Sequence, residues 1–206
     1  MSTLSTTNLK NPSSGSNNIV LATDGSATIA TLSSTTITGT TIQGTIKSGT
    51  SVASTSGTSI DFTSIPSWVK RITVMFQGVS TTGTSQILIR LGTASGFIST
   101  AGTYLGSADD MGSAVGPNNL STGFSFEDTS MASAAVRHGT AMLCNITGNN
   151  WIFSATAARS DATTLMIGAG SISAASLGGT LDRVRITTVN GTDTFDAGTI
   201  NLLWEG

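Results

Sequence analysis

The side chains in this sequence that could do chemistry are few and widely spaced. His138 is the only histidine and Cys144 the only cysteine. A structural zinc site needs a cluster of such ligands, so one histidine and one cysteine are too few. The only metal site left open is one in which three chains each contribute His138 at a three-fold axis. His138 also lacks a partner nucleophile in a Gly-x-Ser-x-Gly motif. We therefore expect neither a catalytic triad nor a metal site.

Paired carboxylates are the best remaining candidates for catalysis, because glycan-cleaving enzymes use two acidic side chains. The sequence offers three such pairs: Asp109-Asp110, Glu127-Asp128 and Asp193/Asp196. The first lies in a stretch rich in Gly and Ser, and the third follows an Asn-Gly turn signal, so we interpret both as solvated loop residues. Their oxygens could also ligate calcium, but the EF-hand spacing is missing. We expect no catalytic residue and no cofactor.

The composition and net charge of the chain exclude some classes of binding partner. Charged residues make up 10% of the 206 residues, and the net charge is −2. A basic surface that would attract nucleic acid or an anionic membrane is therefore not expected. The chain has no apolar run near the ~18 residues of a membrane helix, and Met1–Lys10 lacks the basic and apolar regions of a signal peptide. We expect no nucleic-acid partner, no membrane insertion, and synthesis in a cytoplasm.

The elements that position these side chains fall into two unlike parts. Residues 1–60 contain no aromatic residue and only three charged ones, and Ser and Thr fill nearly half of the segment. Such a segment cannot bury enough apolar surface to offset the entropy of ordering its backbone. Either it is disordered, or other chains complete its core.

Two patterns in this first part indicate β-structure. Asp24-Gly25 separates the β-prone runs 19–22 and 26–30, which predicts a hairpin. A five-residue repeat follows over 36–50, with Gly39, Gly44 and Gly49 at equal spacing and Ile37, Ile42 and Ile46 as its apolar members. Thr and Ile favour extended backbone, so the repeat predicts a slender β-rich stalk whose Ile residues are buried between intertwined copies. A flexible Ser/Thr/Gly linker is the alternative.

From residue 61 onward the pattern is that of an all-β domain. In 68–79, Trp68, Ile72, Val74 and Phe76 are predicted to share one face of a strand. Further strands are predicted at 85–91, 96–99, 122–127, 139–147, 151–157, 163–168, 181–189 and 198–204. Many short strands separated by Gly, Ser and Asn turns indicate a β-sandwich of the jelly-roll kind. We therefore divide the chain into 1–60, an attachment segment and stalk, and 61–206, the sandwich.

The most loop-like stretch of the sandwich is 92–137. Loops on a rigid scaffold often carry binding residues, and exposed aromatic rings stack on sugars or fill interface pockets. Phe124 and Phe126 alternate in a way that predicts core positions. This leaves Phe97 and Tyr104, where exposed, together with Asp109 and Asp110, as the recognition candidates.

Several segments resemble a known family. Asn11-Pro12-Ser13-Ser14, followed by Asn18-Ile19-Val20-Leu21 and Asp24-Gly25, is similar to an N-terminal element of bacteriophage tail-fibre proteins. Residues 65–74 (IPSWVKRITV), 179–188 (GTLDRVRITT), 190–198 (NGTDTFDAG) and 204–206 (WEG) resemble the C-terminal domain of such fibres. Together these segments cover well under half of the chain, and none of them carries a catalytic residue.

The resemblance implies a homotrimeric appendage of the virion. Its N-terminal segment would attach to the tail, baseplate or another virion protein, and its C-terminal domain would bind a host-surface glycan or protein. This agrees with a stalk that needs partner chains. Two alternatives stay open: a head fibre or decoration protein that binds no receptor, and a glycan depolymerase that uses a carboxylate pair.

Overall fold

The computed structural model describes residues 8–9, 12–13, 15, 19–21, 23, 27–29, 46–111, 117–128, 131–133, 135–161, 164–172 and 177–206. The contacts between residues divide the chain into two compact units, Met1–Ile42 and Gln43–Gly206. Every element whose bounds the structure gives is a β-strand. Within these residues, no helix is long and apolar enough to cross a membrane.

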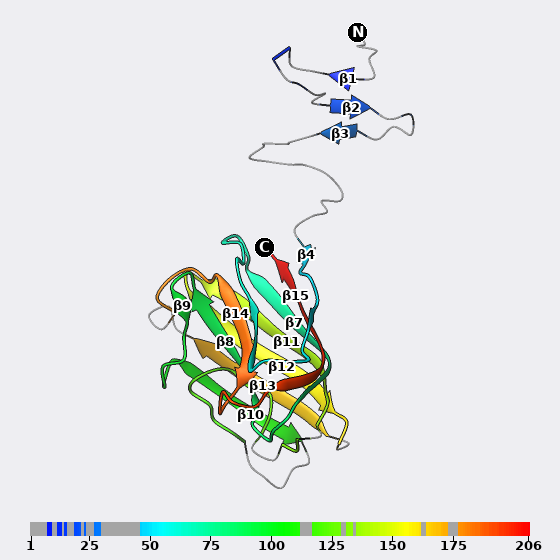
Figure 1. Ribbon diagram of the computed structural model, residues 1–206. Helices are drawn as coiled ribbons and strands as arrows, with labels where there is room; N and C mark the ends of the chain where they lie inside the picture. Colours follow the sequence, from blue (N-terminus) through cyan, green and yellow to red (C-terminus); the bar gives the residue numbers. More distant parts are fainter. Residues whose placement is uncertain are drawn as a thin grey trace. The chain divides into compact units, whose positions relative to one another are not determined.

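The first unit contains one small antiparallel sheet. Its strands are β1 (Asn8–Leu9), β2 (Ile19–Leu21) and β3 (Ala27–Ile29), in the order β1-β2-β3 (Figure 1). The pairing of Ile19 with Ile29 confirms the predicted hairpin. Its turn residues Asp24 and Gly25, and the repeat residues from Ile37 to Gly44, lie outside the described residues, so the stalk stays a prediction.

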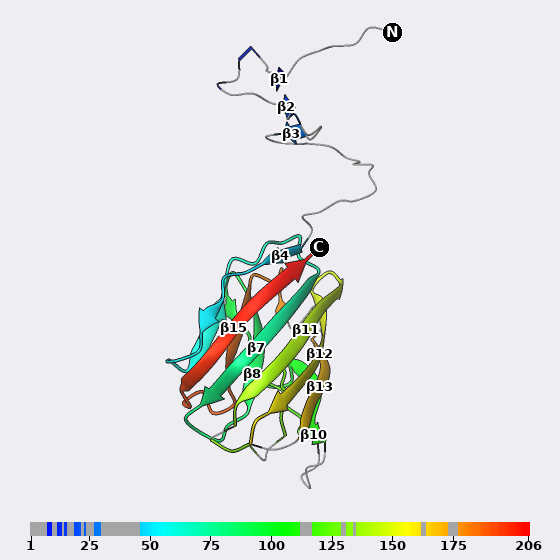
Figure 2. The same cartoon turned by 90° about the vertical axis from the view of Figure 1, so that its right-hand side faces the viewer.

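The second unit is a β-sandwich made of two antiparallel sheets, which confirms the predicted fold class (Figures 1 and 2). The larger sheet has the order β10 (Tyr104–Met111), β13 (Leu165–Ile172), β12 (Asn150–Arg159), β11 (Arg137–Thr147), β7 (Arg71–Thr81), β15 (Phe195–Glu205) and β4 (Ile46–Ser48), and β5 (Val52–Ala53) also pairs with β15. The smaller sheet has the order β6 (Ser59–Phe62), β14 (Arg183–Thr188), β8 (Ile87–Thr93) and β9 (Gly96–Phe97).

The core lies between the two sheets and follows the period of two expected of strands. On β7, Ile72, Val74 and Phe76 are buried, as predicted. Trp68 is 44% exposed and does not join them, because the strand begins only at Arg71. Turn residues precede that strand, so the alternation of β7 does not extend back to the tryptophan.

Strands that precede residue 61 belong to the sandwich. Ile46 pairs with Glu205, Val52 with Ile200, and Ile60 with Ile186. The contact boundary therefore falls between Ile42 and Gln43, earlier than the predicted division at 60/61. Val52 packs against the core and Ile60 is part of it, so these positions contribute to the sandwich without any aromatic ring.

The stretch 92–137 contains more regular structure than the sequence indicated. It includes β10, which was expected to be loop, whereas the predicted strand at 122–127 is reduced to an isolated bridge between Phe124 and Ile89. A second bridge joins Asn118 to Ala108. The segment 118–124 thus hydrogen-bonds to β8 of the smaller sheet and to β10 of the larger one. Phe124 and Phe126 are buried, as predicted.

The two ends of the sandwich are distinct. At the C-terminal end, Arg71 and Ile46 both pair with Glu205, close to the last residue. At the far end, β7 finishes at Thr81 opposite Phe195, and β11 begins at Arg137.

Candidate functional site

Tyr104 does not meet the condition of exposure that was set for a recognition residue. Its side chain is buried, and its ring packs edge-on against Phe124, with 4.9 Å between the ring centroids. The Leu91 amide donates to the phenol oxygen at 2.8 Å, and the phenol donates to the Ile98 carbonyl at 3.0 Å. Burial raises the pKa of Tyr104 to about 12. The residue therefore joins the core to the backbone of β8.

Phe97 is partly exposed at the edge of the smaller sheet, where two arginines lie over it. The Arg185 guanidinium carbon is 4.1 Å from the ring centroid, and that of Arg183 is 5.6 Å away. Both arginines also pair with acidic residues of the same chain, Arg185 with Asp61 and Arg183 with Asp182. The ring thus supports two cations that are already paired.

Asp109 and Asp110 lie on strand β10 rather than in the expected loop, and they point to opposite sides of it. Asp110 is buried, and its Oδ2 accepts a hydrogen bond from Arg159 Nη1 at 2.7 Å. Burial raises the pKa of this carboxyl despite the arginine. Asp109 faces outward and is partly exposed. The two carboxylates therefore do not face a common substrate.

A buried ion pair at the far end was not anticipated from the sequence. The side chains of Glu127 and Arg137 are both 0% exposed and form an ion pair. Glu127 Oε2 also accepts the Ile87 amide at 2.7 Å, and Arg137 Nη1 donates to the Ala135 carbonyl at 3.0 Å. Burial raises the pKa of Glu127. This carboxylate is part of the structural framework and is not open to a substrate.

His138 and Cys144 lie on β11 and take no part in a metal cluster. His138 is exposed, and its Nδ1 accepts the Gly78 amide at 3.2 Å. Cys144 is a free, partly exposed thiol. Among the residues that the structure describes, no group of three or more His, Cys, Asp or Glu side chains could hold a metal ion.

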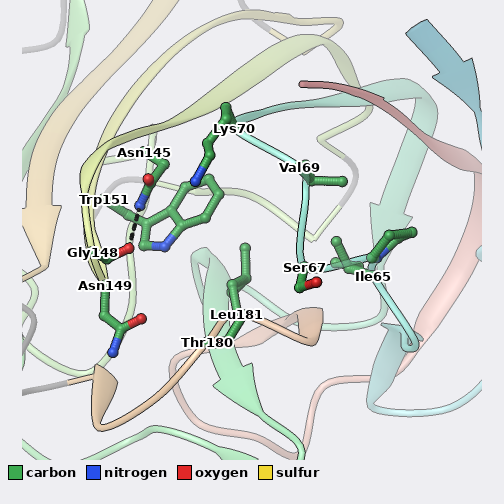
Figure 3. A pocket seen from close by; sticks show the side chains of 11 residues that line it. Ile65, Ser67, Val69, Lys70, Asn145, Gly148, Asn149, Trp151, Thr180 and Leu181 are labelled. Atoms are coloured by element: carbon green, nitrogen blue, oxygen red, sulfur yellow. Dashed lines mark hydrogen bonds between the residues drawn. The ribbon is translucent and has the colours of Figure 1, made fainter. Parts of the chain in front are cut away.

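A hollow of about 200 Å³ lies at the C-terminal end (Figure 3). Four segments build it: the turn before β7, the β11–β12 turn, the first residues of β12, and the segment before β14. Its lining residues are Ile65, Pro66, Ser67, Val69, Lys70, Asn145, Gly148, Asn149, Trp151, Thr180 and Leu181. The lining combines apolar side chains with ammonium, amide and hydroxyl groups.

The shape of the hollow depends on a locked turn between β11 and β12. Asn145 Nδ2 donates to the Gly148 carbonyl at 2.9 Å and to the Asn150 carbonyl at 3.1 Å. The first of these bonds is the dashed line in Figure 3. Gly148 has a φ of 53°, a left-handed conformation that glycine adopts without strain. This turn fixes Asn149 at the rim and Trp151 at the wall.

Several donors at this hollow are left for a ligand. Lys70 is exposed and forms no ion pair with any described residue. Trp151 is 3% exposed, yet its indole N–H makes no hydrogen bond within the described part of the chain. Ser67 and Asn149 add a hydroxyl and an amide. An aromatic wall with several donors suits a small ligand that is rich in oxygen, such as a sugar.

Sequence reasoning did not find this hollow, because its residues are far apart along the chain. The run Gly148-Asn149-Asn150-Trp151 was the one usable signal, since it places amide side chains and an aromatic ring around a tight turn. No protein-family model matches the chain, and no curated protein or solved structure shows significant similarity to it.

Proposed function

We propose that this chain is a bacteriophage tail-fibre protein, a structural component of the virion that recognises the host surface through its C-terminal sandwich. In this proposal it is a homotrimer whose N-terminal segment attaches to the tail, the baseplate or another virion protein. The resemblance of residues 65–74 and 179–188 to fibre domains supports this assignment, as does the division into a small N-terminal unit and a sandwich.

The observation that carries the recognition role is the hollow at Trp151. The Lys70 ammonium and the Trp151 indole N–H both line the hollow, and neither has a partner among the described residues. A sugar offers hydroxyls that match these donors and an apolar ring face that matches the aromatic ring. The volume of about 200 Å³ suits a single sugar unit rather than a long chain. Each site would therefore bind weakly. Three sites on one fibre, and several fibres on one particle, would raise the avidity by orders of magnitude without a tight single site.

The test is binding of the purified full-length protein to a panel of bacterial surface polysaccharides, together with its ability to block phage adsorption. We expect Lys70→Gln and Asn149→Ala each to weaken binding by roughly tenfold, the effect of about 1.4 kcal/mol. Thr192→Ala, an exposed change at the far end of the sandwich, is the matched control and leaves binding unchanged.

Two outcomes would replace this proposal. A protein that binds no polysaccharide and does not block adsorption would indicate a head fibre or decoration protein. Release of reducing sugar ends from the polysaccharide would instead indicate a depolymerase.

A further inference from the structure

The outer surface of the larger sheet is unusually apolar. Eleven large hydrophobic residues are exposed among those that the structure describes, and seven of them lie on four neighbouring strands of this sheet. They are Leu105 and Met111 on β10, Leu165 and Ile167 on β13, Ile152 on β12, and Met142 and Ile146 on β11. We call the outward side chains of these four strands the apolar face; the sheet that bears it is seen in Figure 2. Apolar patches of this extent mark interaction surfaces.

The apolar face carries almost no charge. Its outward positions include no lysine or arginine, and Asp109 and His138 are its only titratable side chains apart from the thiol of Cys144. A strongly charged partner would find nothing to pair with here. The surface that matches it best is another neutral, apolar one, and each further copy of the chain offers the same surface.

The relief of the apolar face also suits self-association. Leu105 stands out from the sheet with 66% of its surface exposed. A hollow of about 240 Å³ lies beside it, lined by Ser107, Ala108, Asp109, Ile167, Gly168 and Ala169, four of which are small. A projecting side chain of one copy can therefore enter the hollow of another.

The size of the face is sufficient for a stable contact. Its four strands, about 4.8 Å apart and roughly nine residues long, cover on the order of 600 Å² in projection. Side-chain relief adds to this, which brings the area near the ~800 Å² per partner of a standard interface. We infer that the apolar face of β10, β13, β12 and β11 packs against the same face of further copies of this chain.

The chain contains a reporter for this contact. Cys144, the only cysteine, is partly exposed on the same side of β11, directly opposite Ile152 in the sheet register. Packing of a second copy on the face would shield its thiol. The rate at which Cys144 reacts with a maleimide then reports on the face itself, even where residues 1–42 also hold the copies together.

The experiment compares the full-length protein with Leu105→Lys/Ile167→Lys and, as a milder variant in the centre of the face, Ser154→Lys. The matched control, Val189→Lys/Thr192→Lys, adds the same charge in the exposed β14–β15 turn. Circular dichroism checks that every variant folds. Light scattering gives the mass, and maleimide labelling gives the reactivity of Cys144.

We expect the unmodified protein and the control to have the mass of two or more chains of 20.8 kDa each, and we expect their Cys144 to be labelled slowly. The face variants should label at least about tenfold faster, with or without a fall in mass. Equal labelling rates in all four proteins, or a monomeric unmodified protein, would overturn the inference. Neither readout involves a glycan, so this test is independent of the proposed recognition function.

Discussion

The two ends of the sandwich differ in how completely their polar side chains are paired. Besides the Arg71–Glu205 ion pair, the C-terminal end holds donors that have no partner among the described residues. At the far end, Glu127 and Arg137 are fully buried and pair with each other, and Arg159 lies between Asp110 and Asp161. At the C-terminal end, Lys70 and the indole N–H of Trp151 have no partner within the described residues and open into the hollow. The buried polar groups of the far end therefore hold the fold, whereas the unpaired donors at the C-terminal hollow are left for a ligand.

The physical reason for the far-end arrangement is missing backbone pairing. Residues 125–128 do not form a strand, and the Ile87 amide at the start of β8 donates to the Glu127 carboxylate. A buried carboxylate that accepts backbone hydrogen bonds and an arginine can replace the missing partner. The Glu127 charge is therefore buried at this end because its carboxylate takes the place of a missing strand partner.

The largest expected effect follows from breaking the Glu127–Arg137 pair. Arg137→Met leaves the Glu127 charge buried without its cation, which typically costs about 3–5 kcal/mol. We expect the urea midpoint to fall accordingly, with the transition followed by tryptophan fluorescence.

The double variant Arg137→Met/Glu127→Leu is the control for this change. It removes both charges, so we expect it to recover much of the lost stability. The recovery should be incomplete, because the Ile87 amide loses the carboxylate that accepts its hydrogen bond. A single variant as stable as the unmodified protein would contradict the view that the far end depends on this pair.

A smaller loss is expected from the locked turn at the other end. Asn145→Ala removes the hydrogen bonds to the carbonyls of Gly148 and Asn150, each worth about 1 kcal/mol. We expect the free energy of unfolding to fall by about 1–2 kcal/mol in urea titration. Asn149→Ala, a few residues away at the rim, is the matched control and should change it by less than about 0.5 kcal/mol.

The sequence predicted strands and their buried residues correctly where apolar and polar residues alternate regularly. On β7, apolar residues alternate with polar ones, and the buried members Ile72, Val74 and Phe76 were all identified. The strand predicted at 198–204 corresponds to β15. Strand β10 was missed because its inward positions include Gly106, Ala108 and Asp110 while Leu105 points outward. This is the reverse of the usual pattern, in which apolar residues point inward and polar ones outward. The fold tolerates it because Arg159 pairs with the buried Asp110, and because Asn118 bridges to Ala108 at the edge of the strand.

The candidate site lay beyond sequence reasoning for a related reason. Lys70, Asn149 and Trp151 gain their roles only when the turn before β7 meets the β11–β12 turn. Likewise, Glu127 and Arg137 are ten residues apart, and only the tertiary fold buries both. Tyr104 was the opposite case: a ring in a polar stretch was read as a binding candidate, but its neighbours Phe124 and Leu91 draw it into the core.

The exposed part of the far-end charge cluster predicts a dependence on pH. Hydrogen bonds from Arg159 lower the pKa of Asp161, so the ionised form stabilises the folded state above the ordinary aspartate pKa. That stability is lost as the pH falls through the lowered value. We expect Asp161→Asn to remove up to about 1 kcal/mol at pH 7 and almost nothing at pH 2, as measured by urea midpoints.

Asp110 in the same cluster gives the opposite sign. Its pKa is raised by burial, so its contribution to stability is complete below the ordinary aspartate pKa and declines as the pH rises toward the raised value. Asp110→Asn should therefore lower stability less at pH 7 than at pH 3. Parallel pH profiles for the two variants would contradict the assignment of these opposite shifts.

The smallest effect on stability is expected where the ligand hypothesis is strongest. Lys70 is exposed and has no ion partner in the described structure, so Lys70→Gln should change the free energy of unfolding by less than about 0.5 kcal/mol. The same change should weaken polysaccharide binding, because the ammonium is one of the free donors at the hollow. Measuring both on one protein sample sharpens the comparison between the two ends. A loss of stability as large as that of Asn145→Ala would mean that Lys70 holds the fold, and the C-terminal end would then resemble the far end.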